Sequence, residues 1–174
     1  MKLAYSYENK IFWIHNFLSI KEYKLLHSFV IKNRKLINQK TIISWKQHYN
    51  SNSMYNFNSK IIEQYETALR QQKFVNLTNC DFQSHLRKYS YKESLDWHAD
   101  NNPLRPRKYA AMYYINKNWN ENYSGELMFK DNYIRGFIAP LGNSLIIIDA
   151  ELRHKVNPVA VKNISRFSIQ TWIK

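Results

Sequence analysis

The sequence predicts a mainly β domain with supporting N-terminal helices, an α+β fold. Helical spacing of apolar residues is confined to roughly the first 80 residues. From about residue 81 onward, short alternating runs are separated by turn residues, and all three glycines lie in this second part. The 174 residues are 44% hydrophobic, which is enough to bury one core, so we expect a single domain over residues 1–174.

Two helices are expected in the first part of the chain, with a strand and a polar loop over 41–57 between them. Ser19 and Glu22 form a capping box, and the apolar residues behind it predict a helix over 20–31. A second helix is expected over 59–73. Its apolar residues share one face, namely Ile62, Tyr65 and Leu69.

Eight short strands are expected in the second part. One of them, Leu145–Ile148, is continuously apolar and β-branched, which is typical of a buried strand. Strands of this number and length suit a jelly-roll or cupin-like barrel, or a sandwich, with the helices covering one sheet. We expect the glycines at turns: Gly125, Gly136 and Gly142. We expect the strands at 83–91, 95–99, 107–116, 125–130, 133–139, 144–149, 153–159 and 165–173.

The net charge of +13 leaves two interpretations open. In the first, the charge binds nucleic acid, an anionic surface or an acidic protein. In the second, it reflects a compositional bias, because the Lys and Arg residues are scattered and form no basic tail. No apolar run approaches the ~18–20 residues of a membrane span, and we expect neither a signal nor a transit peptide. The single Cys80 excludes an internal disulfide and fits a reducing compartment, so we expect a cytoplasmic protein without membrane contact.

His98 and Asp100 form a candidate metal-binding pair, because side chains two residues apart on a strand share a face. His154 follows the buried strand and would complete two histidines and one carboxylate, the ligand set of non-haem Fe(II) oxygenases, which leaves three coordination positions open. The alternative is a surface His-Asp pair and an ordinary loop histidine. Four other histidines compete for a ligand role: His15, His27, His48 and His85.

Arg166 opens the last expected strand, whose two faces differ. One face is apolar or β-branched and is expected to pack against the helices: Phe167, Ile169, Thr171 and Ile173. If the other face points into the barrel, Arg166 is its lone buried cation and needs an anion, for which a carboxylate bound through two hydrogen bonds is suited. The alternative is an edge strand with Arg166 in solvent.

Taken in order with the residues around them, these features resemble a family, the prolyl hydroxylases that depend on 2-oxoglutarate and Fe(II). The resemblance is closest to the hypoxia-sensing type and its bacterial relatives, and it covers about residues 83–173. It departs from the pattern where Glu126 replaces a second Gly and where Val159–Ile164 lengthen the loop after His154, which leaves substrate choice open. The matching positions are His98, Asp100, Arg107, Tyr113–Lys117, Trp119, Ser124-Gly125, His154–Val156, Arg166 and Trp172.

The resemblance implies a double-stranded β-helix in which His98, Asp100 and His154 hold Fe(II). 2-Oxoglutarate would chelate the iron, and its far carboxylate would meet Arg166 and the hydroxyl of Tyr114. The other residues implied around the cosubstrate are Tyr89, Met112, Leu127 and Val156. Those implied on the substrate side are Trp172 and Arg107.

The implied reaction is hydroxylation of a C–H bond by O2, with succinate and CO2 as co-products. A prolyl residue of a protein is the expected substrate, and ascorbate is an additional candidate cofactor. Two alternatives stay open: an oxygenase acting on a nucleobase or a free amino acid, and a non-catalytic nucleic-acid-binding module. The module would carry aromatic residues interleaved with a basic stripe on one sheet. It is not favoured, because it leaves the ligand set and Arg166 unexplained.

Overall fold

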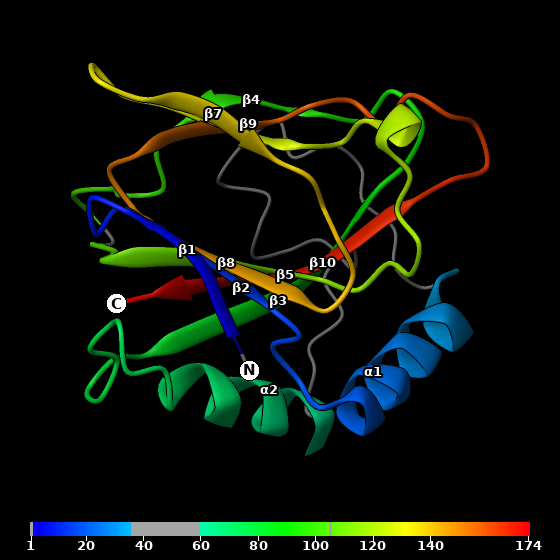
Figure 1. Ribbon diagram of the computed structural model, residues 1–174, viewed down its shortest axis with the longest axis horizontal. Coiled ribbons are helices and arrows are strands. Elements are labelled where there is room, and N and C mark those ends of the chain that lie inside the picture. Colours follow the sequence, from blue (N-terminus) through cyan, green and yellow to red (C-terminus); the bar gives the residue numbers. More distant parts are fainter. Residues whose placement is uncertain (1, 36–59, 105) are drawn as a thin grey trace.

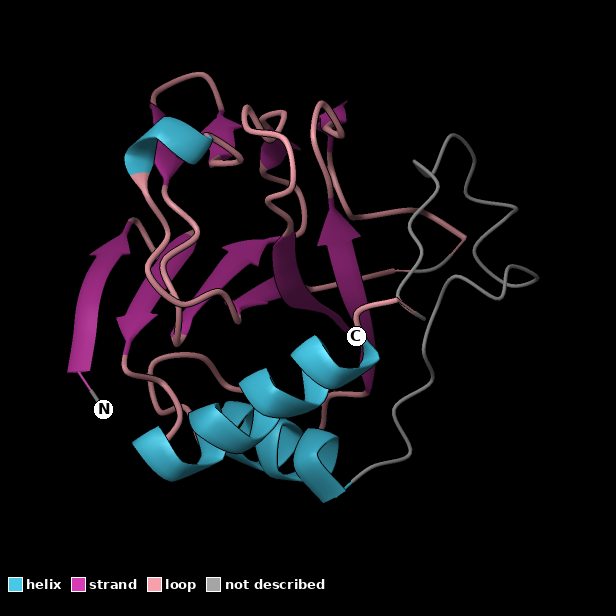
Figure 2. Ribbon diagram, turned by 90° about the vertical axis from the view of Figure 1, so that its right-hand side faces the viewer, coloured by secondary structure: helices cyan, strands magenta, loops and turns pink. Residues whose placement is uncertain are grey.

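The computed structural model describes residues 2–35, 60–104 and 106–174. This part of the chain forms three layers, with two helices below a six-stranded sheet and a four-stranded sheet above it (Figures 1 and 2). The helices are α1 (Ile20–Asn33) and α2 (Lys60–Arg70), and one short 3-10 turn spans Glu121–Tyr123. The strands are β1 (Lys2–Tyr7), β2 (Ile11–His15), β3 (Phe82–Tyr89), β4 (Leu95–His98), β5 (Tyr109–Tyr114), β6 (Leu127–Lys130), β7 (Arg135–Ile138), β8 (Ser144–Asp149), β9 (Arg153–Val156) and β10 (Arg166–Ile173).

The strand order is β1-β2-β8-β5-β10-β3 in the larger sheet and β4-β9-β6-β7 in the smaller one. Neighbouring strands in both sheets run antiparallel. In the described part of the chain the two sheets face each other as separate hydrogen-bonded units rather than one closed barrel. All eight strands expected after residue 81 are confirmed as β3–β10, with ends that differ by up to three residues.

Two features of the strands differ from what the sequence predicts. Gly136 lies inside β7 rather than at a turn, because the ring of Phe129 on β6 occupies the space that a Cβ would need. The hairpin β1–β2 was not expected at all. Its turn, Glu8–Lys10, places Glu8 and Asn9 at φ 44° and 56°, a left-handed backbone that is adopted here without glycine. The strand and loop expected over 41–57 lie outside the described residues.

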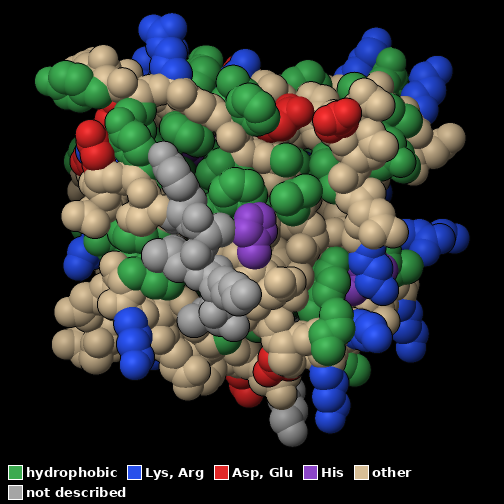
Figure 3. All heavy atoms as spheres, in the orientation of Figure 1, with side chains coloured by type: hydrophobic (Ala, Val, Ile, Leu, Met, Phe, Trp, Pro, Cys, Tyr) green, Lys and Arg blue, Asp and Glu red, His purple; other side chains and the backbone are tan. Residues whose placement is uncertain are grey.

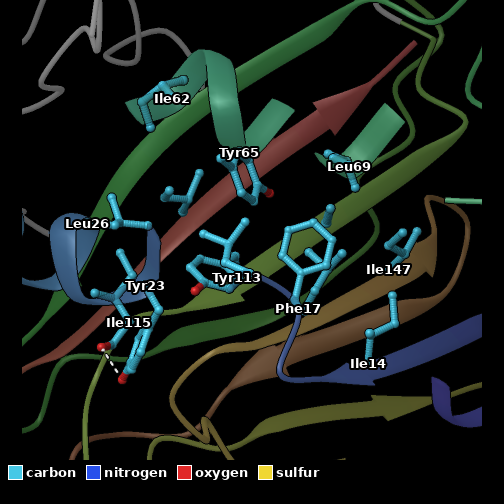
Figure 4. Packing of buried hydrophobic residues seen from close by; sticks show 14 of the residues in the cluster. Ile14, Phe17, Tyr23, Leu26, Ile62, Tyr65, Leu69, Tyr113, Ile115 and Ile147 are labelled. Atoms are coloured by element: carbon cyan, nitrogen blue, oxygen red, sulfur yellow. Dashed lines mark hydrogen bonds between the residues drawn. The ribbon is translucent and has the colours of Figure 1, made fainter. Parts of the chain in front are cut away.

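Both helices pack against the larger sheet. α1 begins at the predicted capping box, in which the Ser19 side chain accepts from the Glu22 backbone and Glu22 from that of Ser19. The side chains of Tyr23 and Leu26 from α1, and of Tyr65 and Leu69 from α2, meet Tyr113 of β5 in one buried cluster (Figure 4). No helix in the described part is long and apolar enough to cross a membrane.

The two faces of β10 divide the molecule as expected. Phe167, Ile169 and Ile173 belong to the core under the helices, and Thr171 bonds the Tyr65 hydroxyl of α2 at 3.1 Å. The opposite face looks into the space between the two sheets, and it carries Arg166 and Trp172. The same space receives the inward side chains of β4 and β9.

Candidate active site

Adjacent strands of the smaller sheet bring the two candidate histidines together. His98 ends β4 and pairs directly with His154 on β9, so their ring centroids lie 4.2 Å apart. Asp100 lies beyond the end of β4, in a loop rather than on the strand as expected. The backbone N–H groups of Asp100 and Asn101 both donate to the carbonyl of Ala150, just before β9, at 2.9 Å. These bonds hold the carboxylate beside the two rings.

The three side chains direct one donor atom each to a common centre. Asp100 Oδ2 lies 3.5 Å from His154 Nε2, and Asp100 Oδ1 lies 4.0 Å from His98 Nε2. Each histidine Nδ1 bonds a backbone carbonyl, that of Asp96 at 2.7 Å and that of Leu152 at 2.9 Å. With Nδ1 protonated by these bonds, Nε2 turns a lone pair to the centre. Ligand atoms of the three residues all lie within 4.8 Å of one another.

The charges around this centre suit a divalent cation. Burial lowers the pKa of His154, as does nearby His98, while Asp100 acts in the opposite direction. His154 therefore favours the neutral form that binds metals. Asp100 Oδ2 is buried and has no hydrogen-bond partner in the described part of the chain. Two imidazoles, one carboxylate and open positions form the ligand set that non-haem Fe(II) sites use.

The other carboxylate oxygen of Asp100, Oδ1, lies beside Trp172 and Arg107, the two residues expected on the substrate side. Trp172 Nε1 donates to Oδ1 at 3.1 Å. Arg107 Nη1 lies 3.6 Å from Oδ1 and donates to the Asp100 carbonyl at 3.1 Å. The Arg107 guanidinium also stacks 3.8 Å over the Trp172 ring. Both residues are buried, so the Arg107 side chain does not extend into solvent.

Arg166 lies in the same space and is only 1% exposed. Its Nη2 donates to the Tyr114 hydroxyl at 3.0 Å, and the guanidinium lies 4.8 Å and 5.2 Å from the Tyr114 and Tyr89 ring centroids. Every Asp and Glu of the sequence belongs to the described residues, and none forms a salt bridge with Arg166. A buried guanidinium without a carboxylate partner provides a binding site for an anion.

The two tyrosines remain hydrogen-bond donors at neutral pH. Burial raises the pKa of Tyr114, although Arg166 acts against this rise. Burial likewise raises the pKa of Tyr89, opposed by Arg87 and Arg166. Both hydroxyls therefore stay protonated next to the guanidinium.

The three apolar residues implied around the cosubstrate are also buried between the sheets. Met112 precedes Tyr114 by two residues on β5 and shares its inward face. Leu127 pairs with Val156 across β6 and β9. Met112, Leu127 and Tyr114 belong to one buried cluster, while Val156 packs with Tyr89 in another.

Two further buried polar residues line this space from β3: Arg87, which sequence reasoning missed, and His85, which it named only as a competing histidine and which is not in the metal-ligand group. The His85 ring lies 4.9 Å from the Trp172 ring, and the Arg87 guanidinium lies 5.7 Å from it. The expectation of a lone interior Arg is thus wrong, because Arg87, Arg107 and Arg166 are all buried. The signal was present, since residues 85, 87 and 89 alternate along one strand and share the face of Tyr89.

Comparisons with known proteins identify the family and the fold. Residues 84–174 match the family model described as the 2OG-Fe(II) oxygenase superfamily, where 2OG is 2-oxoglutarate. No curated protein matches the chain. Many solved structures do, at 20% identity or less for those described here, which establishes a likeness of fold.

Three of these structures cover nearly the whole chain. A prolyl-4-hydroxylase from Pseudomonas putida aligns with a TM-score of 0.72 and 17% identity, over 95% of this chain and 92% of its own. A prolyl hydroxylase from Trichoplax adhaerens, solved with a peptide fragment of the hypoxia-inducible factor, aligns at 0.70 and 16%, over 95% and 84%. A viral collagen prolyl hydroxylase from Paramecium bursaria Chlorella virus-1, solved with 2OG, aligns at 0.68 and 19%, over 94% of each chain. The expected double-stranded β-helix fold is thereby confirmed.

Proposed function

The chain belongs to the 2OG-Fe(II) oxygenase superfamily and is a 2-oxoglutarate-dependent dioxygenase, and we propose that it hydroxylates a prolyl residue of a protein. Fe(II), 2-oxoglutarate and O2 are the cofactor and cosubstrates of this family. The proposal rests on one observation. The candidate metal site and Arg166, a buried arginine that forms no salt bridge with a described carboxylate, lie in the same space between the two sheets. A substrate prolyl C–H bond would be oxidised there, with succinate and CO2 as co-products.

We assign His98, Asp100 and His154 as the Fe(II) ligands. One ligand atom from each of the three lies within 4.8 Å of the others, and their remaining polar atoms contact backbone carbonyls and Trp172. Bound together, Fe(II) and 2-oxoglutarate supply the activation of O2 that no protein side chain provides. The protein contributes the fixed ligand geometry and the positions left open.

We assign Arg166 and Tyr114 to the far carboxylate of 2-oxoglutarate. The guanidinium presents several donors in one plane, which suits a carboxylate, and the Tyr114 hydroxyl adds another beside it. Tyr89 covers the guanidinium from another side. Met112, Leu127 and Val156 exclude water, which strengthens the charge pair in the low local dielectric.

A protein substrate is supported by the neighbour from Trichoplax, which was solved with a peptide. We place the substrate on the side of the site that Trp172 and Arg107 line, because both contact Asp100 directly. We place the reaction in the reducing cytoplasm, which a single cysteine suits. Ascorbate remains a prediction.

Titration of the Fe(II)-loaded protein with 2-oxoglutarate under anaerobic conditions tests the site. We expect a visible charge-transfer band that saturates at one equivalent of 2-oxoglutarate. Replacing Asp100 by Ala should abolish iron binding, whereas Arg166→Ala should retain iron and weaken 2-oxoglutarate by about 30-fold or more. Arg34→Ala is the control, because Arg34 is exposed beyond α1. Unchanged cosubstrate affinity in Arg166→Ala would contradict the assignment of Arg166.

Incubation with proline-containing peptides tests the substrate. We expect 4-hydroxyproline or an isomer in the product and a mass increase of one oxygen atom, and no product from matched peptides with Ala in place of Pro. Consumption of 2-oxoglutarate that is stimulated by a nucleobase or a free amino acid, and by no proline peptide, would instead favour the alternative substrate classes.

A further inference from the structure

The outer face of the four-stranded sheet carries a separate functional surface. Side chains alternate along β9, so His154 points inward while Arg153 and Lys155 point outward. The pairing of β4 with β9 is irregular between Leu95 and His98, and there the Trp97 ring lies beside Lys130 and Lys155 on the outer side. Inward Leu127 on β6 and Ile138 on β7 are buried in the same way. The sheet forms the top layer in Figure 1, with no described helix or strand above it.

Three cations lie in one row across this face. Lys130 on β6 pairs directly with Arg153 of β9 on one side and with Arg135 of β7 on the other. All carboxylates of the sequence lie in the described residues, and none forms a salt bridge with these three side chains. The nearest acid along the hairpin, Asp131, is engaged by Lys10 and by two backbone N–H groups.

Such a row weakens the fold by itself. Like charges directly opposite each other on antiparallel strands repel, and Lys130 meets this repulsion from both neighbours. Lys and Arg side chains stand out along the edges of the molecule in Figure 3. A general excess of positive charge does not by itself place three cations directly opposite one another on neighbouring strands. A bound polyanion would offset the repulsion.

A second row next to the cations is aromatic and apolar. Met128 pairs with Phe137 on one side and with Lys155 on the other, and Trp97 lies beyond Lys155 on β4. Phe137 is 67% exposed. Lys130 Nζ and Lys155 Nζ lie 4.3 Å and 5.5 Å from the Trp97 ring centroid, so cations and rings interleave. Tyr133, 85% exposed, extends the aromatic surface at the hairpin tip.

We propose that this outer face binds single-stranded nucleic acid. Phosphates would lie along the Arg153–Lys130–Arg135 row, and bases would stack on Phe137 and Tyr133. The two rows are two residues apart along each strand, about 7 Å, a separation that a nucleotide spans between its phosphate and its base. An acidic peptide would pair with the cations but leave the exposed rings without a role. The surface faces away from the metal centre, so this inference does not depend on the proposed reaction.

Fluorescence anisotropy with a labelled oligouridylate, in the absence of iron and 2-oxoglutarate, tests the surface. The sheet variant replaces Lys130, Arg135 and Arg153 together by Ala. We expect its affinity to fall tenfold or more, and the slope of log K against log salt to fall by about 2, since three phosphate contacts are lost. Phe137→Ala should weaken binding by about tenfold and leave the salt slope unchanged, because a stacking contact carries no charge.

The matched control replaces Lys21, Lys24 and Lys32 by Ala, which removes the same charge from exposed positions of α1. We expect less than a twofold change in affinity. Equal weakening in both triple variants would overturn the proposal, because total charge would then explain binding. The proposal would also fail if polyglutamate, or phosphatidylserine vesicles, displaced the oligonucleotide at matched charge; an acidic protein or a membrane would then be the partner.

A stability measurement separates a binding surface from a structural one. Lys130→Gln relieves repulsion on both sides, so we expect Tm to rise by about 1–3 °C while oligonucleotide affinity falls. A lower Tm in this variant would show that Lys130 serves the fold, and would overturn the argument from repulsion.

Discussion

The two carboxylate oxygens of Asp100 have different neighbours. Oδ1 accepts a hydrogen bond from Trp172 and lies near Arg107, whereas Oδ2 has no such partner in the described part and faces His154. The rotation of the carboxylate is therefore determined before any ion binds. This division lets one residue serve both as a proposed ligand and as a fixed part of the buried space.

Removing the indole N–H should reveal this effect. Trp172→Phe keeps an aromatic ring under Arg107 but removes the donor to Oδ1. We expect Fe(II) affinity to fall by about 10–100-fold, because the ligand loses its orienting contact. Anaerobic titration with Fe(II) measures this affinity. At saturating iron, kcat should return closer to the value of the parent chain than the KM for iron does.

Trp13→Phe provides the control. Trp13 Nε1 has no hydrogen-bond partner among the described residues. Its ring lies 4.4 Å from the His15 ring and packs against the cluster of Trp172 without a bond to Asp100, so the substitution removes an indole N–H that orients no proposed ligand. We expect its metal affinity to equal that of the parent chain. Equal metal affinity in Trp172→Phe would mean that Oδ1 needs no donor.

Among the elements, the turn before β8 tolerates the least change. A Cβ at Gly142 would overlap the backbone carbonyl of Asn116 and would meet the Tyr23 hydroxyl that bonds this carbonyl. Neither group can move without separating α1 from the larger sheet. Gly142→Ala should therefore destabilise the protein by about 3 kcal/mol, at the upper end of overpacking effects, as measured by urea unfolding.

Gly136→Ala is a matched comparison. Its Cβ would lie 2.5 Å from the tip of the Phe129 ring, which can give way more easily than a backbone carbonyl. We expect a cost of about 1 kcal/mol, relieved in the double variant with Phe129→Leu. A larger loss at position 136 than at position 142 would contradict this explanation.

The elements predicted from the sequence are those whose hydrophobic pattern follows from burial of one face or of both faces. β8 is apolar throughout because sheet and helix layers cover it, and β10 alternates because its two faces meet different environments. The hairpin β1–β2 was missed because Glu8 and Asn9 adopt left-handed backbone without glycine. Gly136 was wrongly expected at a turn. Its small size makes room for the Phe129 ring on the neighbouring strand, a contact that the local sequence does not show.

The same reasoning explains the site. The three proposed metal ligands were predicted, as were Arg166 and Tyr114, because their order and spacing resemble a family. His85 and Arg87 belong to no such motif, and their burial became evident only once β3 was paired with β10. The cation row on the outer face was hidden for a similar reason, since its members come from three strands.

At the scale of the whole molecule, a partly buried ion pair among the described residues joins the two sheets. Lys10, at the start of β2, meets Asp131, at the β6–β7 turn, at 2.7 Å. The hydrogen bond from Lys10 and those from the Tyr133 and Ile134 backbones lower the pKa of Asp131 from 3.8 to about 2. The bond to Asp131 also raises the pKa of Lys10 above 10.5.

The pH dependence of this ion pair follows from the lowered pKa of Asp131 and the raised pKa of Lys10. Asp131 has a lower pKa folded than unfolded, so its contribution is complete above about pH 4 and is lost as the pH falls through about 2. Asp131→Asn should lower Tm by a few degrees at most at neutral pH, and the difference should narrow at about pH 3. Asp96→Asn is the control, because Asp96 is exposed and forms no salt bridge among the described residues. A difference that stayed constant down to pH 3 would contradict the ion pair.

The alternation of β9 also limits how this chain can diverge. His154 and Val156 face inward, and Arg153 and Lys155 face outward. A single-residue insertion or deletion within β9 would exchange the two sets, removing an imidazole from the interior and burying cations there. Viable length changes in descendants of this sequence should therefore accumulate outside the strand. The loop over 160–165, which follows the buried and bridged Val159, is the natural place for them.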